Sequence, residues 1–214
     1  MFRILLTATL LLASNAAFAD ADESKVNGDI AVMQGKSAGN LDTVNGSIMV
    51  GDKATIQSAE TVNGSIAIGT DVKAASLSTV NGRIDVGNRS RVEKGIEAVN
   101  GTIVLRDAVE VGGNVENVNG NIGLAATRVG GQLKTTSGNI SIGVGAHVGG
   151  GVLVEKPSGW FNGNKTKPRV VIGPQAVVEG TLEFRRDVEL LVSESATIGT
   201  VKGAKATRFS GDTP

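Results

Sequence analysis

A short motif that returns at an almost constant interval is the feature that most constrains how this 214-residue chain can fold. Val-Asn-Gly occurs six times at spacings of 18 or 19 residues, and Thr136-Ser137-Gly138 takes the next place in the series. A fixed period of this length indicates an architecture built by stacking one structural unit on the next. The six motifs begin at Val26, Val44, Val62, Val80, Val99 and Val118.

Within each repeat, apolar residues occur in alternating pairs that follow one another about every six residues. Ile48 and Val50 are followed by Ala54 and Ile56, and the same rhythm continues through most of the chain. Alternation with a period of two indicates a short strand with one buried face. Three such sides make one coil of 18 residues. We therefore predict an all-β fold, a three-sided single-stranded parallel β-solenoid (β-helix) of about nine coils over residues 26–201.

The coil length also favours one hand and a narrow interior. Coils of 19 residues fit a strict left-handed hexapeptide repeat poorly, so we expect a right-handed solenoid in which one corner holds the extra residue as a bulge. Neighbouring coils would stack about 4.8 Å apart and bury each other's apolar faces. Such an interior has little room for rings, in keeping with one Trp, five Phe and no Tyr.

The Asn-Gly pair is expected to turn the chain at one corner of every coil. If Val44 and Ile48 point into the core, Asn45 and Gly46 form the bend, because both residue types tolerate positive φ. Thr43 would then face outward. Stacked coils would place one asparagine each in a column whose side-chain amides form a hydrogen-bonded ladder. This structural column consists of Asn27, Asn45, Asn63, Asn81, Asn100 and Asn119.

The N-terminus has the pattern of a secretory signal peptide. Arg3 precedes an apolar run, and Ala17-Phe18-Ala19 forms a small-x-small cleavage site. We expect residues 1–19 to be removed, leaving a polar segment at 20–25, the solenoid at 26–201 and a tail at 202–214. The apolar run is too short to span a membrane as a helix, and we expect no transmembrane segment in the mature chain. The expected location is the periplasm, with secretion or the cell surface as the alternative.

Composition argues against several functional classes. The mature chain would carry 20 basic and 21 acidic side chains, so it has no general attraction for nucleic acid. One His and no Cys argue against a zinc site. His147 alternates with inward-facing Ala146 and Val148, so we expect it on the surface, without an acidic partner. We predict no catalytic residue, no cofactor and no metal site, and hence a protein that is not an enzyme.

The rhythm is interrupted once, by about twelve extra residues within the segment EKPSGWFNGNKTKPR at 155–169. Insertions in solenoids form loops that leave one face, often the binding face. An exposed aromatic pair with cationic neighbours would be an interface anchor. The alternative is that the aromatic pair folds back and covers the solenoid wall. The candidate interaction residues are Trp160, Phe161, Lys165, Lys167 and Arg169.

Two parts of the repeat resemble known bacterial solenoids. The recurrence of VNGxI over residues 26–142 is similar to that in bacterial adhesin-like β-solenoids of unassigned function. The segments VVIGPQAVVEGTLEF (170–184) and ATIGTVKGA (196–204) resemble the repeats of bactofilins, which are polymer-forming right-handed β-helices. These resemblances imply a structural or surface role and bring no catalytic residue with them.

The sequence therefore predicts an exported, non-enzymatic, adhesin-like structural or interaction protein of the bacterial cell envelope. It would present solenoid faces and the aromatic loop to a protein or polysaccharide partner. Two alternatives remain. One is a self-assembling, bactofilin-like polymer or homo-oligomer formed by end-to-end stacking of coils. The other is a polysaccharide-binding or polysaccharide-cleaving β-helix, which would need carboxylates converging in a groove.

Overall fold

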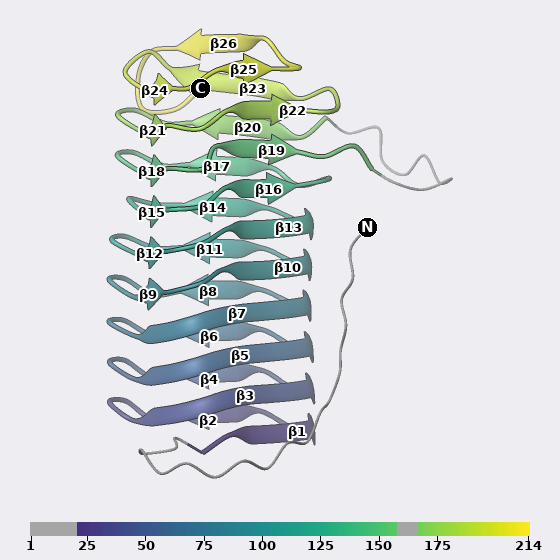
Figure 1. Cartoon of the computed structure of the whole chain (residues 1–214), viewed down its shortest axis with the longest axis vertical. Helices are drawn as coiled ribbons and strands as arrows, with labels where there is room; N and C mark the ends of the chain where they lie inside the picture. Colours follow the sequence, from purple (N-terminus) through teal and green to yellow (C-terminus); the bar gives the residue numbers. More distant parts are fainter. Residues whose placement is uncertain (1–20, 158–166) are drawn as a thin grey trace.

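In the computed structural model, the described residues 21–157 and 167–214 wind into a rod of stacked parallel strands and contain no helix (Figure 1). The nearer strands in Figure 1 run left to right and the fainter, more distant strands run right to left as the chain climbs, so the solenoid is right-handed. One sheet holds ten strands, one from each coil, against the roughly nine coils expected. The predicted signal peptide and Trp160, Phe161 and Lys165 lie outside the described residues.

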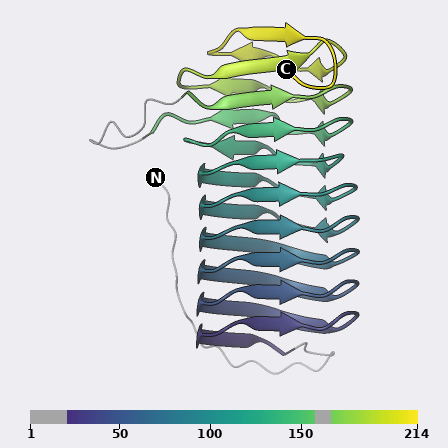
Figure 2. The same cartoon turned by 180° about the vertical axis from the view of Figure 1, so that it is seen from behind.

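Wall 1 of the rod is the ten-stranded sheet, which faces the viewer in Figure 2. Its strands are β2 (Ile30–Val32), β4 (Ile48–Val50), β6 (Ile66–Ile68), β8 (Ile84–Val86), β11 (Ile103–Leu105), β14 (Ile122–Leu124), β17 (Ile140–Ile142), β20 (Arg169–Ile172), β23 (Glu189–Ser193) and β26 (Ala206–Phe209).

Walls 2 and 3 belong to one sixteen-stranded sheet that bends around the rest of the rod. Wall 2 consists of β9 (Arg91–Val92), β12 (Glu110–Val111), β15 (Arg128–Val129), β18 (His147–Val148), β21 (Val177–Val178) and β24 (Thr197–Ile198). Wall 3 consists of β1 (Glu23–Asn27), β3 (Ser37–Asn45), β5 (Thr55–Asn63), β7 (Lys73–Asn81), β10 (Ile96–Asn100), β13 (Val115–Asn119), β16 (Leu133–Thr135), β19 (Val152–Val154), β22 (Leu182–Phe184) and β25 (Val201–Lys202).

Strand register shows where the coil changes from 18 to 19 residues. Ala74 pairs with Val92, eighteen residues later, whereas Leu77 pairs with Ile96, nineteen residues later. The extra residue therefore lies between Val92 and Ile96. The nine-residue strands β3, β5 and β7 each span walls 2 and 3 without a break. In the coil after β7, the extra residue divides the corresponding strand into β9 on wall 2 and β10 on wall 3.

The interruption at 155–169 leaves the register of the walls intact. Ile140 of β17 pairs with Val170 of β20, thirty residues later, which is twelve more than an 18-residue coil needs. On wall 3, Val152 of β19 pairs with Leu182 of β22 at the same thirty-residue separation. The rod therefore continues through the insertion with each column in place.

The predicted inward pairs are buried and form one continuous aliphatic core. Ile48, Val50, Ala54 and Ile56 are all at most 4% exposed, and the same columns stay buried along the rod. Each fully buried Val, Leu or Ile side chain contributes about 2 kcal/mol relative to an exposed one. No single coil encloses its own side chains, so this stabilisation depends on the coils above and below.

The predicted orientation of the corner residues is wrong. Val44 faces outward and is 38% exposed, whereas Thr43 is only 4% exposed. The strand alternates through Leu41 and Thr43 inward, which turns Val44 to the outside. The Thr43 hydroxyl donates a hydrogen bond to the carbonyl oxygen of Gly28 at 3.0 Å. Thr61 and Thr79 repeat this bond to the corner glycine of the coil before, so the buried hydroxyl and the corner carbonyl satisfy each other.

At four of the six Val-Asn-Gly corners, glycine is required by lack of space rather than by backbone conformation. Among the Val-Asn-Gly glycines, positive φ occurs at Gly28 and Gly120. At the four between them, a Cβ would overlap the carbonyl oxygen of the corner glycine in the preceding coil. Any side chain there would force two stacked coils apart. The four are Gly46, Gly64, Gly82 and Gly101.

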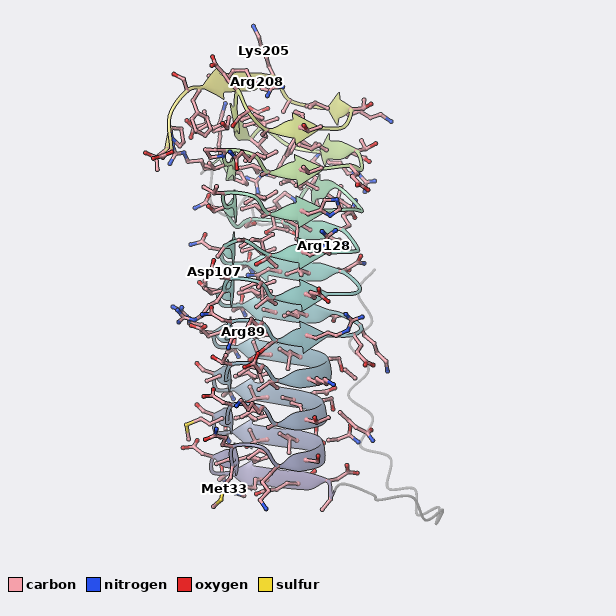
Figure 3. All side chains as sticks on the ribbon, turned by 90° about the vertical axis from the view of Figure 1, so that its left-hand side faces the viewer. Met33, Arg89, Asp107, Arg128, Lys205 and Arg208 are labelled. Atoms are coloured by element: carbon pink, nitrogen blue, oxygen red, sulfur yellow. The ribbon has the colours of Figure 1, made fainter. Side chains whose placement is uncertain are left out.

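The corner between walls 1 and 2 is built differently from the asparagine corner. Gly51-Asp52 and its equivalents begin this turn, but the left-handed residue comes one position later, at Lys53 with φ of 58°. Asp71, Arg89 and Ala108 adopt the same conformation in later coils. This corner therefore bends at a residue with a side chain, and Figure 3 shows Arg89 and Asp107 along it.

Candidate functional site

Two residues of the candidate interaction loop lie within the described part of the chain, at the base of the insertion. Lys167 Nζ lies 3.4 Å from Asp187 Oδ2, and Arg169 Nε lies 3.4 Å from Glu189 Oε2. Both cations therefore contact carboxylates of the following coil. The aromatic pair and Lys165 are outside the described residues, so the role of the loop stays a prediction.

The six predicted column asparagines come together in one hydrogen-bonded ladder. Asn45 Nδ2 donates to Asn27 Oδ1 at 3.0 Å, and Asn63 Nδ2 donates to Asn45 Oδ1 at 2.9 Å. The same bond links each later member to the one before, at 2.9 to 3.0 Å. The amides are exposed, and each is hydrogen-bonded to the amide of a neighbouring coil. The ladder therefore has a structural role and keeps the coils in register at this corner.

His147 lies on wall 2 as expected, but it has an acidic partner. Its Nε2 is 2.9 Å from Glu179 Oε1, and its Nδ1 is 3.5 Å from a guanidinium nitrogen of Arg128. Glu179 belongs to the next coil, thirty-two residues later, so neighbourhood in the sequence could not indicate it. The histidine is one member of a line of charges along wall 2, which also pairs Arg91 with Glu110.

Wall 3 carries a column of carboxylates formed by Asp42, Glu60, Glu97 and Glu116, with Ser78 between the second and third. Burial, and then the neighbouring charges of Asp42 and Glu97, raise the pKa of Glu60. Burial and the charge of Asp22 likewise raise the pKa of Asp42, although a hydrogen bond from Ser24 opposes this. Within residues 21–157 and 167–214, no three His, Cys, Asp or Glu side chains are placed to hold a metal ion.

Wall 1 carries a different feature at its centre, a cluster of two arginines around one carboxylate. Arg106 donates to both oxygens of Asp85, at 2.8 and 3.0 Å, and Arg83 donates to Asp85 Oδ2 at 2.8 Å. Burial disfavours the charged form of Asp85, but the hydrogen bonds from Arg106 and Arg83 outweigh it, so the pKa of this carboxyl is lowered. Both arginine side chains remain more than half exposed.

A shallow depression lies on either side of Arg106. The first is lined mainly by Gly69, Thr70, Gly87 and Asn88, together with Asp85 and Arg106 themselves. The second is lined by Val104, Gly123 and Ala125, and by Asp107. Both are open to solvent, and both linings also include large aliphatic residues, Ile68 in the first and Leu105 and Leu124 in the second. The Arg83–Asp85–Arg106 cluster and the first depression make up the candidate site.

Local sequence does not reveal this site because its members come from three different coils. Its one signal is a break in a column: Arg106 takes the position that Gly51, Gly69 and Gly87 occupy in earlier coils. Aligning the coils by their motif would have shown the substitution. It would not have shown that the side chain turns back over the preceding coil to reach Asp85.

Charged residues occupy core columns at both ends of the rod. In the first coil, Glu23 and Lys25 pair in register with Leu41 and Thr43, and their side chains form an ion pair at 2.9 Å. In the last coil, Arg208 pairs in register with Val192 and donates to backbone carbonyls of Ser193 and Ala196. Figure 3 places Arg208 and Lys205 at one end of the rod and Met33 at the other.

Comparison of the chain with protein-family models, with curated proteins and with solved structures found no match. In the part of the chain that the structure describes, no helix has the length and apolar character needed to cross a membrane.

Proposed function

We propose that this chain is an exported, non-enzymatic interaction protein of the bacterial cell envelope, a stiff adhesin-like rod that presents its walls and the inserted loop to a partner. The observation that carries the proposal is the placement of charge in the core columns at both ends of a continuous solenoid. Charged ends disfavour stacking of one rod on another, so this placement favours binding along the walls. Export rests on the signal-peptide pattern of residues 1–19, and the periplasm is the proposed location.

The end residues act against stacking of one rod on another. A second molecule placed beneath the first coil would cover Glu23 and Lys25, which stand where later coils have Leu41 and Thr43. Removing such a pair from water costs several kcal/mol per ion unless new partners replace the solvent. Inward-pointing charges are a recognised means by which β-sheet proteins block their open edges. A bactofilin-like polymer is therefore the less favoured alternative.

Blocked stacking at the two ends is tested by measuring the mass of the mature chain in solution. Multi-angle light scattering should give a monomer, and electron microscopy should show isolated short rods. Glu23→Leu, Lys25→Thr and Arg208→Val together give each end the residue of its own column, and this variant should associate end to end. Filaments of the unmodified chain, or an unchanged monomer in the triple variant, would refute the argument.

Binding along a wall is tested by site-specific crosslinking. A photoreactive residue is placed at Ala67, which is exposed on wall 1, and in a second protein at Lys205, at the end of the rod. The expected result is crosslinking of an envelope component from the wall position and none from the end. Crosslinks from the end alone would contradict the proposal.

The inserted loop is tested by Trp160→Ala combined with Phe161→Ala. We predict that this variant keeps the unfolding temperature of the parent chain and loses partner capture. Unchanged capture would exclude the loop and leave the walls as the binding surface.

A further inference from the structure

We propose that the first depression on wall 1 binds an acidic sugar unit of an envelope glycan, with Arg106, which lines it, holding the carboxylate or phosphate and Arg83 adding positive charge next to Asp85. This inference rests on the proposed function and names the partner class of one wall. It is carried by the geometry of the arginine cluster and by the chemistry of the surface next to it.

Both arginines have N–H donors that Asp85 does not use. Asp85 accepts two hydrogen bonds from Arg106 and one from Arg83. A guanidinium carries about five N–H donors in a planar fork suited to carboxylate and phosphate. The remaining donors of both side chains face solvent, since Arg83 is 52% and Arg106 is 55% exposed. One carboxylate between two guanidinium groups leaves the cluster with a net positive charge.

Asp85 also fixes where that charge lies. Arg106 comes from the coil after Asp85 and reaches back over the wall, and Arg83 approaches Asp85 along the same strand edge, two residues away. Two long side chains are thereby held on one spot before any ligand arrives, which lowers the entropy lost on binding. The buried part of the carboxylate acts as a positioning group for both arginines.

The surface beside the cluster favours a sugar over a protein segment. Gly69 and Gly87 contribute backbone to the lining of the first depression, and Thr70 and Asn88 contribute a hydroxyl and an amide. Protein partners are held mainly by large apolar or aromatic anchors, which this depression does not offer. A polar, shallow surface with a neighbouring cation matches the hydroxyls and the acid group of one sugar unit. Asp107 lines the second depression and would repel an anion there.

The test is a titration of the mature chain with three defined glycans. Oligogalacturonate carries carboxylates, phosphomannan carries phosphates, and dextran is neutral. We expect binding of at least one acidic glycan and none of dextran, with affinity that falls as salt increases. The two acidic probes decide between carboxylate and phosphate. Equal binding of dextran, or binding of none of the three, would overturn the inference.

Variants with a matched control locate the site. Arg106→Gln should weaken binding about tenfold, the loss of one charge-assisted pair. Arg83→Gln removes one hydrogen bond to Asp85 and one charge of the cluster, but Arg83 does not line the depression, so this variant should weaken binding less than Arg106→Gln does. It serves if the first variant folds poorly. Arg89→Gln is the control, because Arg89 makes the same two-bond pair with Asp71 at 2.8 and 2.9 Å but lines neither depression. Equal weakening in the control would show general charge attraction and overturn the assignment.

A further arm separates a glycan from other anionic surfaces. Vesicles of anionic phospholipid and an acidic peptide should bind more weakly than the acidic glycan, and tighter binding of either would overturn the glycan class. The failure of this inference is distinguishable from that of the proposed function. A chain that binds no acidic glycan but is crosslinked from wall 1 loses only the ligand class, whereas a filament-forming chain loses the proposed function.

Discussion

The strongest test of the architecture is Gly82→Ala, a single methyl group added at the asparagine corner. The Cβ would overlap the carbonyl oxygen of Gly64 in the coil before. Oxygen and carbon would have to move apart by more than about 1 Å to reach the 3.0 Å below which real Cβ atoms essentially never approach a neighbour. The obstacle is backbone in a stacked coil, so no side chain can turn aside to make room.

The free-energy change follows from the bonds that join these two corners. Gly64 N–H donates to Asn81 O at 3.1 Å, Ile66 N–H donates to Arg83 O at 2.8 Å, and the Thr79 hydroxyl donates to Gly64 O at 3.2 Å. Separating the coils by more than 1 Å would break or weaken all three. At about 1 kcal/mol for each bond, with about 1–2 kcal/mol for overpacking, we expect a loss of roughly 4–5 kcal/mol.

The measurement is urea unfolding of the purified chain, followed by circular dichroism. Gly123→Ala is the matched control, because Gly123 also lies in a stacked coil but its added Cβ would meet its nearest neighbour at 4.0 Å. We expect the control to unfold within about 0.5 kcal/mol of the parent, as for surface substitutions in general. If Gly82→Ala is no less stable than Gly123→Ala, the corner glycine is not required by close stacking.

Three further predictions concern polar groups. Asn63→Ala removes two hydrogen bonds of the ladder and should lower the unfolding free energy by about 1 kcal/mol. Asn119→Ala removes one and should lower it by about half as much. Equal losses would contradict the ladder. Asn117→Thr should stabilise the chain by about 1 kcal/mol in thermal unfolding, because Asn117 Oδ1 is buried without a hydrogen-bond partner among the described residues. No gain in stability would show that this oxygen has a partner. Glu60→Gln should be more stable than the parent near pH 7 and no more stable near pH 4. The reason is that the pKa of Glu60 is raised in the folded state, so its contribution to the stability of the fold is lost as the pH rises through that pKa. Urea unfolding at both pH values measures the difference. A gain in stability near pH 4 would refute this explanation.

The candidate site illustrates a limit on what the repeat could predict. The spacing of Val-Asn-Gly shows which residues share a column, and hence that Arg106 replaces a glycine. Whether its side chain extends into solvent or turns back to Asp85 depends on packing against the preceding coil. The same limit applies to His147, whose partner Glu179 lies thirty-two residues away. Contacts between coils are the ones that local sequence cannot specify.

The amino-acid sequence by itself determined the solenoid, the coil length, the buried aliphatic columns and the column of asparagines. A period that recurs six times leaves few ways to bury its apolar residues, and alternation assigns most of them to the core. The tertiary structure alone decided which way the corner faces. Thr43 lies inside because a glycine carbonyl of the coil before accepts its hydroxyl, and Val44 is thereby turned outward. It also decided why glycine stands at the bend, because the space for a Cβ is occupied by the backbone of another coil.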